Sequence, residues 1–184
     1  MISPDDILHF WFDEAGPKRW YVKDAGFDTE VKARFETAID TKAEEVRRHG
    51  RSPWEATAYG ALALVLLFDQ FSRNIHRGSA RAFAYDELAR AAARHALDRG
   101  FDADVPAVRR AFFYLPFMHS EDLADQELCL ELATQRLDDP ATADFARRHL
   151  DVVRRFGRFP HRNAMLGRKS SADEEAFVKE HKGF

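Results

Sequence analysis

The sequence predicts an all-α fold of about eight helices packed as stacked helical hairpins. Three observations support this prediction. Serine–proline or aspartate–proline pairs, which suit the first turn of a helix, recur at positions 3–4, 52–53 and 139–140. Glycines that favour helix ends stand at Gly50 and Gly157. No stretch alternates apolar and polar residues as a strand does, so we expect a single all-helical domain over residues 1–184.

The first fifty residues predict a short helix followed by a long one. Pro4 follows Ser3 and opens a helix that we expect to run through Phe12, before a loop over residues 13–27. Asp28 is then predicted to cap an amphipathic helix that ends at Gly50. The apolar residues predicted on its inner face are Val31, Phe35, Ile39 and Val46.

The next helix is predicted to be the centre of the molecule. Ser52-Pro53-Trp54-Glu55 has the pattern of a capping box with proline at the first helical position. The residues up to Phe71 are apolar around almost the whole helical circumference, which predicts a buried helix from Pro53 to Phe71. Asp69 and Gln70 end this apolar run, need hydrogen-bond partners, and are expected to have a structural role.

The second half of the chain gives further helix signals. Pro116 has no amide donor and is expected to kink or end the helix that contains it. The other predicted boundaries are a helix from Ser79 to Gly100, a cap at Asp104, a restart at Ser120-Glu121-Asp122, a helix from Asp139 to Gly157, and a capping box at Ser171 and Glu174.

The composition is that of a globular protein, with 184 residues, 45% of them hydrophobic, and a net charge of −3. The single Cys129 excludes an intramolecular disulfide and is expected to be an ordinary buried residue. The apolar run Ala61–Phe68 is too short to cross a bilayer, and the N-terminus lacks a signal-peptide pattern, so we expect a cytoplasmic protein. The acidic balance argues against a nucleic acid as partner, and no cofactor is indicated.

One basic segment departs from this balance. Residues 152–172 contain five arginines, one lysine and one histidine but no acid. Within it, Phe-Pro-His-Arg-Asn-Ala-Met-Leu-Gly over 159–167 is similar to Phe-Ser-Arg-Asn-Ile-His-Arg-Gly over 71–78. Each segment places Arg-Asn shortly after a phenylalanine and before a glycine. This similarity predicts two loops of one design, each before a serine-capped helix, and suggests an old duplication of a helix–loop–helix unit.

Four motifs together resemble the bacterial "domain of unknown function 924" family, and the resemblance runs from Ile7 to about Phe177. It implies an all-helical fold similar to tetratricopeptide hairpin stacks and implies no established activity. Tyr21 and Ser72 stand where the family would have Phe and Pro. The four motifs are Phe10-Trp-Phe12, Leu67-Phe-Asp-Gln-Phe-Ser-Arg-Asn-Ile-His-Arg-Gly78, Tyr114-Leu-Pro-Phe-Met-His-Ser-Glu121 and Arg155-Phe-Gly-Arg-Phe-Pro-His-Arg-Asn-Ala-Met-Leu-Gly-Arg168.

The two Arg-Asn segments are the first candidate site, predicted to bind a small anionic ligand or an acidic peptide. Arginine offers planar, permanently charged donors for carboxylate or phosphate, and asparagine can donate, accept or hold a left-handed turn. In the alternative, the seven acids among residues 121–139 neutralise the arginines through an ion-pair network. The candidate ligand-binding residues are Arg73, Asn74, Arg77, Arg158, His161, Arg162, Asn163 and Arg168.

The second candidate site is His119-Ser120-Glu121, which follows a predicted helix break. His119 and Glu121 form a candidate general acid–base pair, or a metal site together with His149 or His161. In the alternative, Ser120 and Glu121 cap a helix while His119 binds nearby backbone. We expect no metal, because the histidines lack the paired spacing of a helical metal site.

Three hypotheses of function remain open from the sequence. The chain is a binding module for an anion, an enzyme that uses His119 or His161 as acid or base on an anionic substrate, or a structural or protein-interaction module with internally paired arginines. The sequence does not identify the ligand or the oligomeric state. If the two Arg-Asn segments are stacked copies, their arginines should meet at one patch beside His119 and His161.

Overall fold

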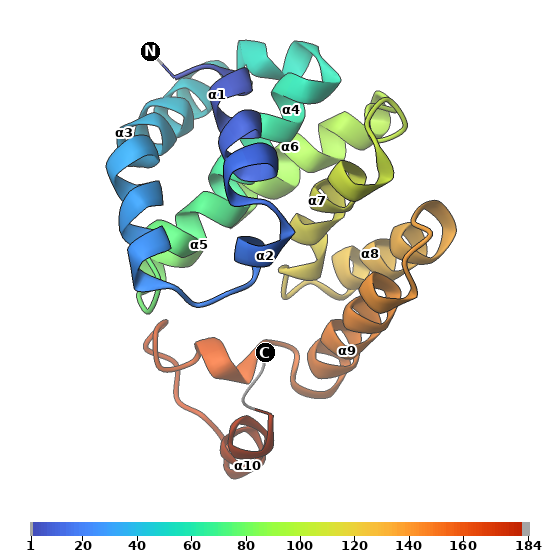
Figure 1. The fold of residues 1–184 in the computed structure, drawn as a ribbon. Helices are drawn as coiled ribbons and strands as arrows, with labels where there is room; N and C mark the ends of the chain where they lie inside the picture. Colours follow the sequence, from blue (N-terminus) through green and yellow to red (C-terminus); the bar gives the residue numbers. More distant parts are fainter. Residues whose placement is uncertain (1, 182–184) are drawn as a thin grey trace. The chain divides into compact units, whose positions relative to one another are not determined.

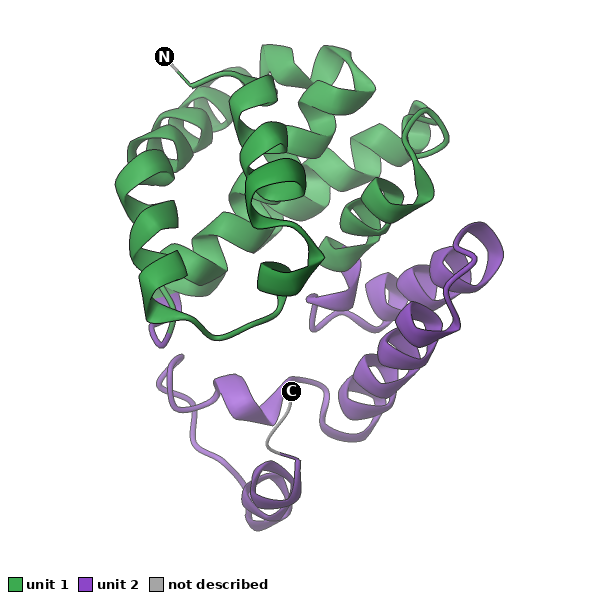
Figure 2. Ribbon diagram, viewed as in Figure 1, with its two compact units in different colours: residues 1–77, 81–116 green, residues 78–80, 117–184 purple. Residues whose placement is uncertain are grey.

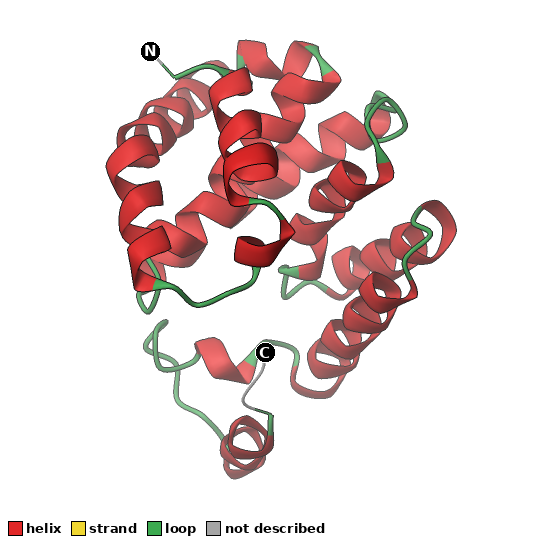
Figure 3. Cartoon of the chain, viewed as in Figure 1, coloured by secondary structure: helices red, strands yellow, loops and turns green. Residues whose placement is uncertain are grey.

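The computed structural model describes residues 2–181 and confirms the all-α prediction. Within that range the chain forms helices joined by turns and loops, without a strand (Figure 3). None of the helices in this part of the chain combines the length and the apolar character that a membrane span requires. The likeness to tetratricopeptide stacks stays a prediction.

The chain divides into two compact units, shown in Figure 2. Unit 1 comprises Met1–Arg77 and Arg81–Pro116, and unit 2 comprises Gly78–Ala80 and Phe117–Phe184. The expectation of one domain over residues 1–184 also stays a prediction.

In chain order up to residue 118, the helices in Figure 1 are α1 (Pro4–Leu8), a π-helix (His9–Ala15), α2 (Pro17–Trp20), α3 (Ala25–His49), a 3₁₀-helix (Pro53–Ala56), α4 (Ala58–Leu66), a π-helix (Leu67–Phe71), α5 (Ser72–Ile75), a 3₁₀-helix (Ala80–Phe83), α6 (Asp86–Asp98) and α7 (Ala107–Met118).

The first helix begins where predicted and ends later. The Ser3 hydroxyl accepts a hydrogen bond from the Asp6 amide, so Ser3 caps α1. The predicted end at Phe12 is wrong, because α1 continues directly into the π-helix, which runs to Ala15. Gly16 follows with a φ of 64°, a left-handed conformation that suits glycine and ends the helix.

The predicted cap of the long helix α3 is also wrong. Asp24, four residues earlier than Asp28, has extended backbone, and its Oδ1 accepts from the amides of Gly26 at 2.8 Å and Phe27 at 3.1 Å. Asp28 therefore lies inside the first turn and is used for a tertiary ion pair. The end of α3 at Gly50, with a φ of 77°, is confirmed.

The predicted central helix is buried as expected but is interrupted. The capping box of Ser52 and Glu55 is confirmed, yet it opens a 3₁₀-helix that stops before Thr57. Thr57 then caps α4 through its hydroxyl, which accepts from the Gly60 amide. Because a Cβ at Gly60 would lie 2.1 Å from the carbonyl oxygen of Trp54, the break depends on glycine there. Apart from Tyr59, every residue of α4 is buried.

An aromatic core packs rings of the two π-helices against one another and against α3. Ring centroids of Phe10 and Phe35 are 4.9 Å apart, as are those of Phe35 and Phe71, and Trp11 lies 5.4 Å from Phe71. The Trp20 indole donates to the Trp11 carbonyl at 2.7 Å. These rings join the N-terminal segment to α3 and to the end of the central helix.

Two predicted boundaries in the middle of the chain are wrong. Ser79 does not start the next helix, since a 3₁₀-helix intervenes and α6 begins at Asp86. Asp104 does not cap α7, which starts after Pro106, whose carbonyl accepts from the amides of Arg109 and Arg110. Pro116 lies inside α7, which ends two residues later at Met118.

Unit 2 contains α8 (Leu123–Arg136), α9 (Pro140–Phe156), a 3₁₀-helix (Pro160–Arg162) and α10 (Ala172–Glu180). α8 and α9 pack side by side (Figure 1). The predicted cap at Asp139, the left-handed Gly157 and the capping box of Ser171 and Glu174 are confirmed. A small apolar cluster joins the end of α9 to α10 and consists of Val152, Val153, Phe159 and Phe177.

The predicted caps Ser120 and Glu121 are wrong, because Asp122 caps α8. Its Oδ1 accepts from the amides of Ala124 at 2.8 Å and Asp125 at 3.2 Å. Ser120 accepts from the Asp122 amide instead. Glu121, which lies between α7 and α8, therefore makes its contacts elsewhere in unit 2.

Candidate functional site

The Arg-Asn pair of the first segment is helical, because the π-helix ending at Phe71 continues into α5, and only residues 76–78 form a turn. Arg73 Nη1 lies 2.9 Å from Asp69 Oδ1 and 3.0 Å from Asp86 Oδ1. Burial alone would lower the pKa of Arg73, but the negative charges of Asp69 and Asp86 raise it. Asp69 and Gln70 also bond each other, as Gln70 Nε2 donates to Asp69 at 2.6 Å. The structural role expected for this pair is therefore confirmed.

Arg77 and Asn74 are engaged by one carboxylate of α3. Arg77 donates to Asp28 twice, from Nε at 2.6 Å and from Nη2 at 2.9 Å, and Asn74 Nδ2 donates to Asp28 at 2.8 Å. The left-handed turn suggested for Asn74 and Asn163 is wrong, since only glycines have positive φ among the described residues. Three predicted ligand residues of unit 1 thus hold its helices together.

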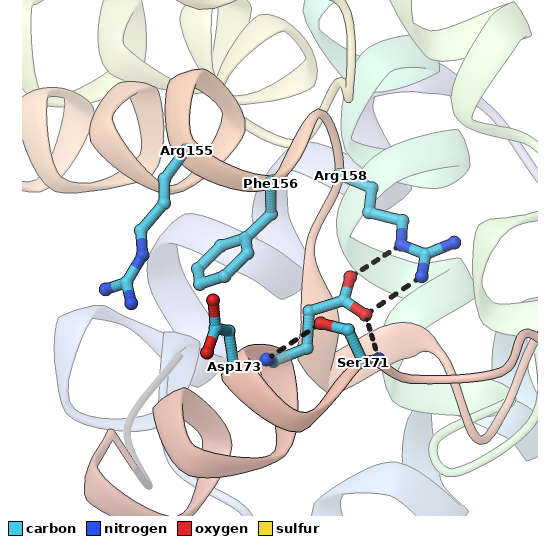
Figure 4. A pocket seen from close by; sticks show the side chains of 6 residues that line it. Arg155, Phe156, Arg158, Ser171 and Asp173 are labelled. Atoms are coloured by element: carbon cyan, nitrogen blue, oxygen red, sulfur yellow. Dashed lines mark hydrogen bonds and ion pairs between the residues drawn. The ribbon is translucent and has the colours of Figure 1, made fainter.

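In unit 2, Arg158, which is labelled in Figure 4, is bound by the buried Glu174. Arg158 donates to Glu174 from Nε at 2.7 Å and from Nη2 at 2.9 Å, and the Ser171 amide donates to the same carboxylate at 2.7 Å. The hydrogen bonds from Arg158 are the main reason that the pKa of Glu174 falls to about 2. A surface pocket of about 440 Å³ lies beside this pair, and its lining also includes Arg155, Phe156 and Asp173.

Arg168 is bound by Glu121. Arg168 Nη1 and Nη2 lie 2.6 Å and 2.8 Å from the two carboxylate oxygens, and the amide of Phe159 donates to the same carboxylate at 2.8 Å. Arg168 Nε donates to Asn163 Oδ1, and Asn163 Nδ2 donates to Ser170. Burial would raise the pKa of Glu121, but the bonds from Arg168 and Phe159 lower it. Glu121 is therefore held as a carboxylate and fastens the 159–168 segment to the start of α8.

The remaining predicted residues of unit 2 gather around the buried Phe159 ring. The His149 and His161 rings each lie 5.6 Å from it, centroid to centroid, and the Arg162 guanidinium lies 4.5 Å from its centroid. His119 is close enough that its charge would act on both of these histidines. We call His119, His149, His161 and Arg162 the histidine–arginine cluster.

Electrostatics keep two members of the cluster neutral. Burial is the main cause that lowers the pKa of His149 to about 4, with His119, Arg162 and His161 adding to it. Burial also lowers the pKa of His161 to about 4, followed by the charge of Arg162. Both histidines are therefore neutral imidazoles at pH 7, each with one N–H donor and one acceptor nitrogen.

Sequence reasoning missed the residue that supports His119. Gln126 is buried in α8, and its Nε2 donates to the carbonyls of Met118 at 2.7 Å and Ser120 at 2.6 Å, on either side of His119. The glutamine thereby fixes the irregular backbone after α7. The sequence predicted His149 only as a possible metal ligand. Its spacing of four residues from Phe145 places the two side chains on one face of α9, and this spacing was the available signal. Among the described residues, no three His, Cys, Asp or Glu side chains are arranged to hold a metal ion.

The predicted residues thus divide between the two units. Arg73, Asn74 and Arg77 lie in unit 1, whereas residues 158–168 and His119 lie in unit 2. A shared patch of both Arg-Asn segments stays a prediction.

Comparison with known proteins places the chain in a family. The family model described as "Bacterial protein of unknown function (DUF924)" matches residues 7–182. The chain is also similar to a solved structure of a protein of unknown function from Agrobacterium tumefaciens, with 42% sequence identity and a TM-score of 0.88. That match covers 96% of this chain and 97% of the other. No curated protein matches the chain.

Proposed function

The chain belongs to the bacterial protein family of unknown function DUF924, and we propose that its C-terminal unit binds a small anion at the histidine–arginine cluster. The observation that carries this proposal is the grouping of His149, His161 and Arg162 around one buried ring. Arginine and imidazole N–H groups are standard donors to phosphate and carboxylate. The proposal narrows the predicted site to four residues.

The charges around the cluster support an anionic ligand. Placing positive charge on His149 or His161 is unfavourable because of burial and because Arg162 is already charged. A bound anion would offset both effects at once. The carboxylate of Glu121 is engaged by Arg168, although its negative charge still acts on His161.

The other arginines have a different proposed role. Arg73, Arg77, Arg158 and Arg168 each form short ion pairs with carboxylates, which supports the structural alternative for these four. We assign them to the frame of the fold rather than to the ligand. A terminal or side-chain carboxylate of an acidic peptide would satisfy the same cluster. We further propose a cytoplasmic protein without a nucleic-acid partner.

Inorganic phosphate and sulfate are the probes that test this proposal. Titration of the full chain should raise its melting temperature by mass action, with a gain of about 2.7 kcal/mol at a hundredfold excess over Kd. The ring resonances of His149 and His161 should shift in NMR spectra. Arg162→Gln should abolish both responses. Arg154→Gln removes an exposed arginine that pairs with Glu127, so it should leave both unchanged.

Two results would count against the anion site. One is a melting temperature that rises equally in the wild type and in Arg162→Gln, which would indicate a general salt effect. The other is an absence of histidine shifts at saturating phosphate.

An acid–base enzyme is the second candidate, because the His161 imidazole is neutral at pH 7, which is the form that a general base requires. In that case His161 or His119 is the base and Arg162 holds an anionic substrate. Glu121 is then a positioning residue, since its pair with Arg168 keeps it ionised. A panel of phosphate and carboxylate esters tests this candidate. Turnover that His161→Gln abolishes would support it, whereas absence of turnover leaves the binding function alone.

A further inference from the structure

A second pocket, of about 330 Å³, lies on unit 1 between α1, the first π-helix, α4 and α7, and it is separate from the proposed anion site. We propose that this pocket binds a zwitterionic ligand of the amino-acid class, with its carboxylate at Arg109 and its ammonium group at Asp5 and Asp13. The residues that line the pocket are Asp5, Leu8, His9, Asp13, Tyr59 and Arg109.

Arg109 supplies a charged group that is already positioned. Its guanidinium lies 4.6 Å from the Phe12 ring centroid and 5.8 Å from that of Tyr59. Stacking on two rings restricts the side chain, so less freedom is lost when it binds a carboxylate. Within residues 2–181 the Arg109 guanidinium has ring contacts and no carboxylate partner. This distinguishes it from the four paired arginines of the Arg-Asn segments.

The acids of the pocket exclude a purely anionic ligand. Asp5 and Asp13 are two carboxylates against one guanidinium, so negative charge is in excess when His9 is neutral. Asp13 is oriented by His9, whose Nδ1 lies 3.0 Å from Asp13 Oδ2. A cation alone would leave Arg109 unmatched, and an anion alone would face two carboxylates. A ligand that carries both charges satisfies both sides.

The apolar lining and the size of the pocket narrow the ligand class. Leu8 is buried beneath the pocket, and the Tyr59 ring is the one side chain of α4 that is exposed. An apolar or aromatic side chain of the ligand would cover Tyr59 and Leu8. The volume is at the lower end of the range for small-molecule sites, about 300–1,000 Å³, and therefore suits a single amino acid.

L-phenylalanine is the probe for this proposal, compared with two analogues that each lack one charge. Phenethylamine lacks the carboxylate and 3-phenylpropanoate lacks the ammonium group. Calorimetric titration of the full chain should show phenylalanine binding about tenfold more tightly than either analogue, since each loses a charge-assisted contact. NMR shifts should map to residues 5–13 and Arg109.

Matched variants complete the test. Arg109→Gln and Asp13→Asn should each weaken phenylalanine binding about tenfold. Arg155→Gln is the control, because Arg155 likewise stacks on a ring, 4.6 Å from the Phe156 centroid, but lies in unit 2. Unchanged circular dichroism of each variant would show that it folds. The proposal is overturned if phenylalanine does not bind at millimolar concentration, if an analogue binds equally well, or if Arg155→Gln has the same effect as Arg109→Gln.

Discussion

Replacing Glu121 by glutamine removes one negative charge and keeps the shape of the side chain. Three donors meet this carboxylate, two from Arg168 and one from the Phe159 amide. The glutamine side chain would offer a single acceptor oxygen, and its amide N–H groups would face the guanidinium. The side chain of Arg168 is only 23% exposed, so solvent would compensate its charge poorly.

The expected loss of stability lies between that of a surface pair and that of a buried pair. Exposed pairs contribute about 0–1 kcal/mol, and breaking a fully buried pair costs about 3–5 kcal/mol. The Glu121–Arg168 pair is partly exposed on both sides, so we expect a loss of about 2–3 kcal/mol. For a chain of this length this lowers the melting temperature by roughly 2–4 °C per kcal/mol. The difference in stability between the variant and the wild type should shrink as pH falls below 4.5, the ordinary pKa of glutamate. It should vanish below the lowered pKa of Glu121, where the wild-type carboxylate is itself protonated.

The assay must report on unit 2. All tryptophans and tyrosines lie at or before residue 114, so indole fluorescence reports on unit 1. Far-UV circular dichroism and amide hydrogen exchange at Phe159 are suitable instead. Glu127→Gln is the control, because it breaks an exposed pair with Arg154 and should cost less than about 1 kcal/mol. Equal losses in the two variants would refute the argument that Glu121 fastens the 159–168 segment.

Burial of individual side chains gives three further predictions. Leu64 is fully buried in α4, so Leu64→Ala should cost about 2–5 kcal/mol in denaturant unfolding, and an unchanged midpoint would contradict its central position. The pKa of His149 and His161 falls from 6.5 to about 4, so the unfolded chain binds more protons between these values and stability should decrease as pH falls from 6.5 to 4. A double variant with glutamine at both positions should show a weaker pH dependence. Burial raises the pKa of Cys129 to about 12, so a thiol reagent should modify the folded protein far more slowly than the denatured one, and equal rates would show that the thiol is accessible.

Local signals in the sequence predicted the helices well wherever they act within one turn. The caps at Ser3, Asp139 and Ser171, and the glycine ends at Gly50 and Gly157, depend on neighbouring residues alone. The predictions failed where two nearby residues could cap. Asp24 and Asp28 are both acceptable caps. Asp28 instead accepts a hydrogen bond from Arg77, which lies 49 positions further along the chain. Asp122 replaces Ser120 and Glu121 for the same reason, since Arg168 and Phe159 occupy Glu121.

The candidate site was predictable in its residue types and not in its grouping. Both Arg-Asn segments look alike as sequence, but one continues a π-helix into α5 while proline at 160 starts a short 3₁₀-helix in the other. Backbone geometry therefore sends their side chains to different partners. The π-helices themselves left no signal, because they differ from α-helices by one backbone hydrogen-bond step and not by apolar periodicity.

The pairing pattern explains why a basic segment does not make a basic site. Arg158 and Arg168, two of the arginines in residues 152–172, are each met by a carboxylate from another part of unit 2, Glu174 and Glu121 respectively. The carboxylate of each pair also accepts a hydrogen bond from a backbone N–H, which belongs to Ser171 or Phe159. The charge of Arg162 lowers the pKa of both histidines beside Phe159, whereas the charge of Glu121 raises that of His161. The ion pairs thus hold the segment in place and match the charges of Arg158 and Arg168 within unit 2, so neither arginine adds an unmatched positive charge to the segment.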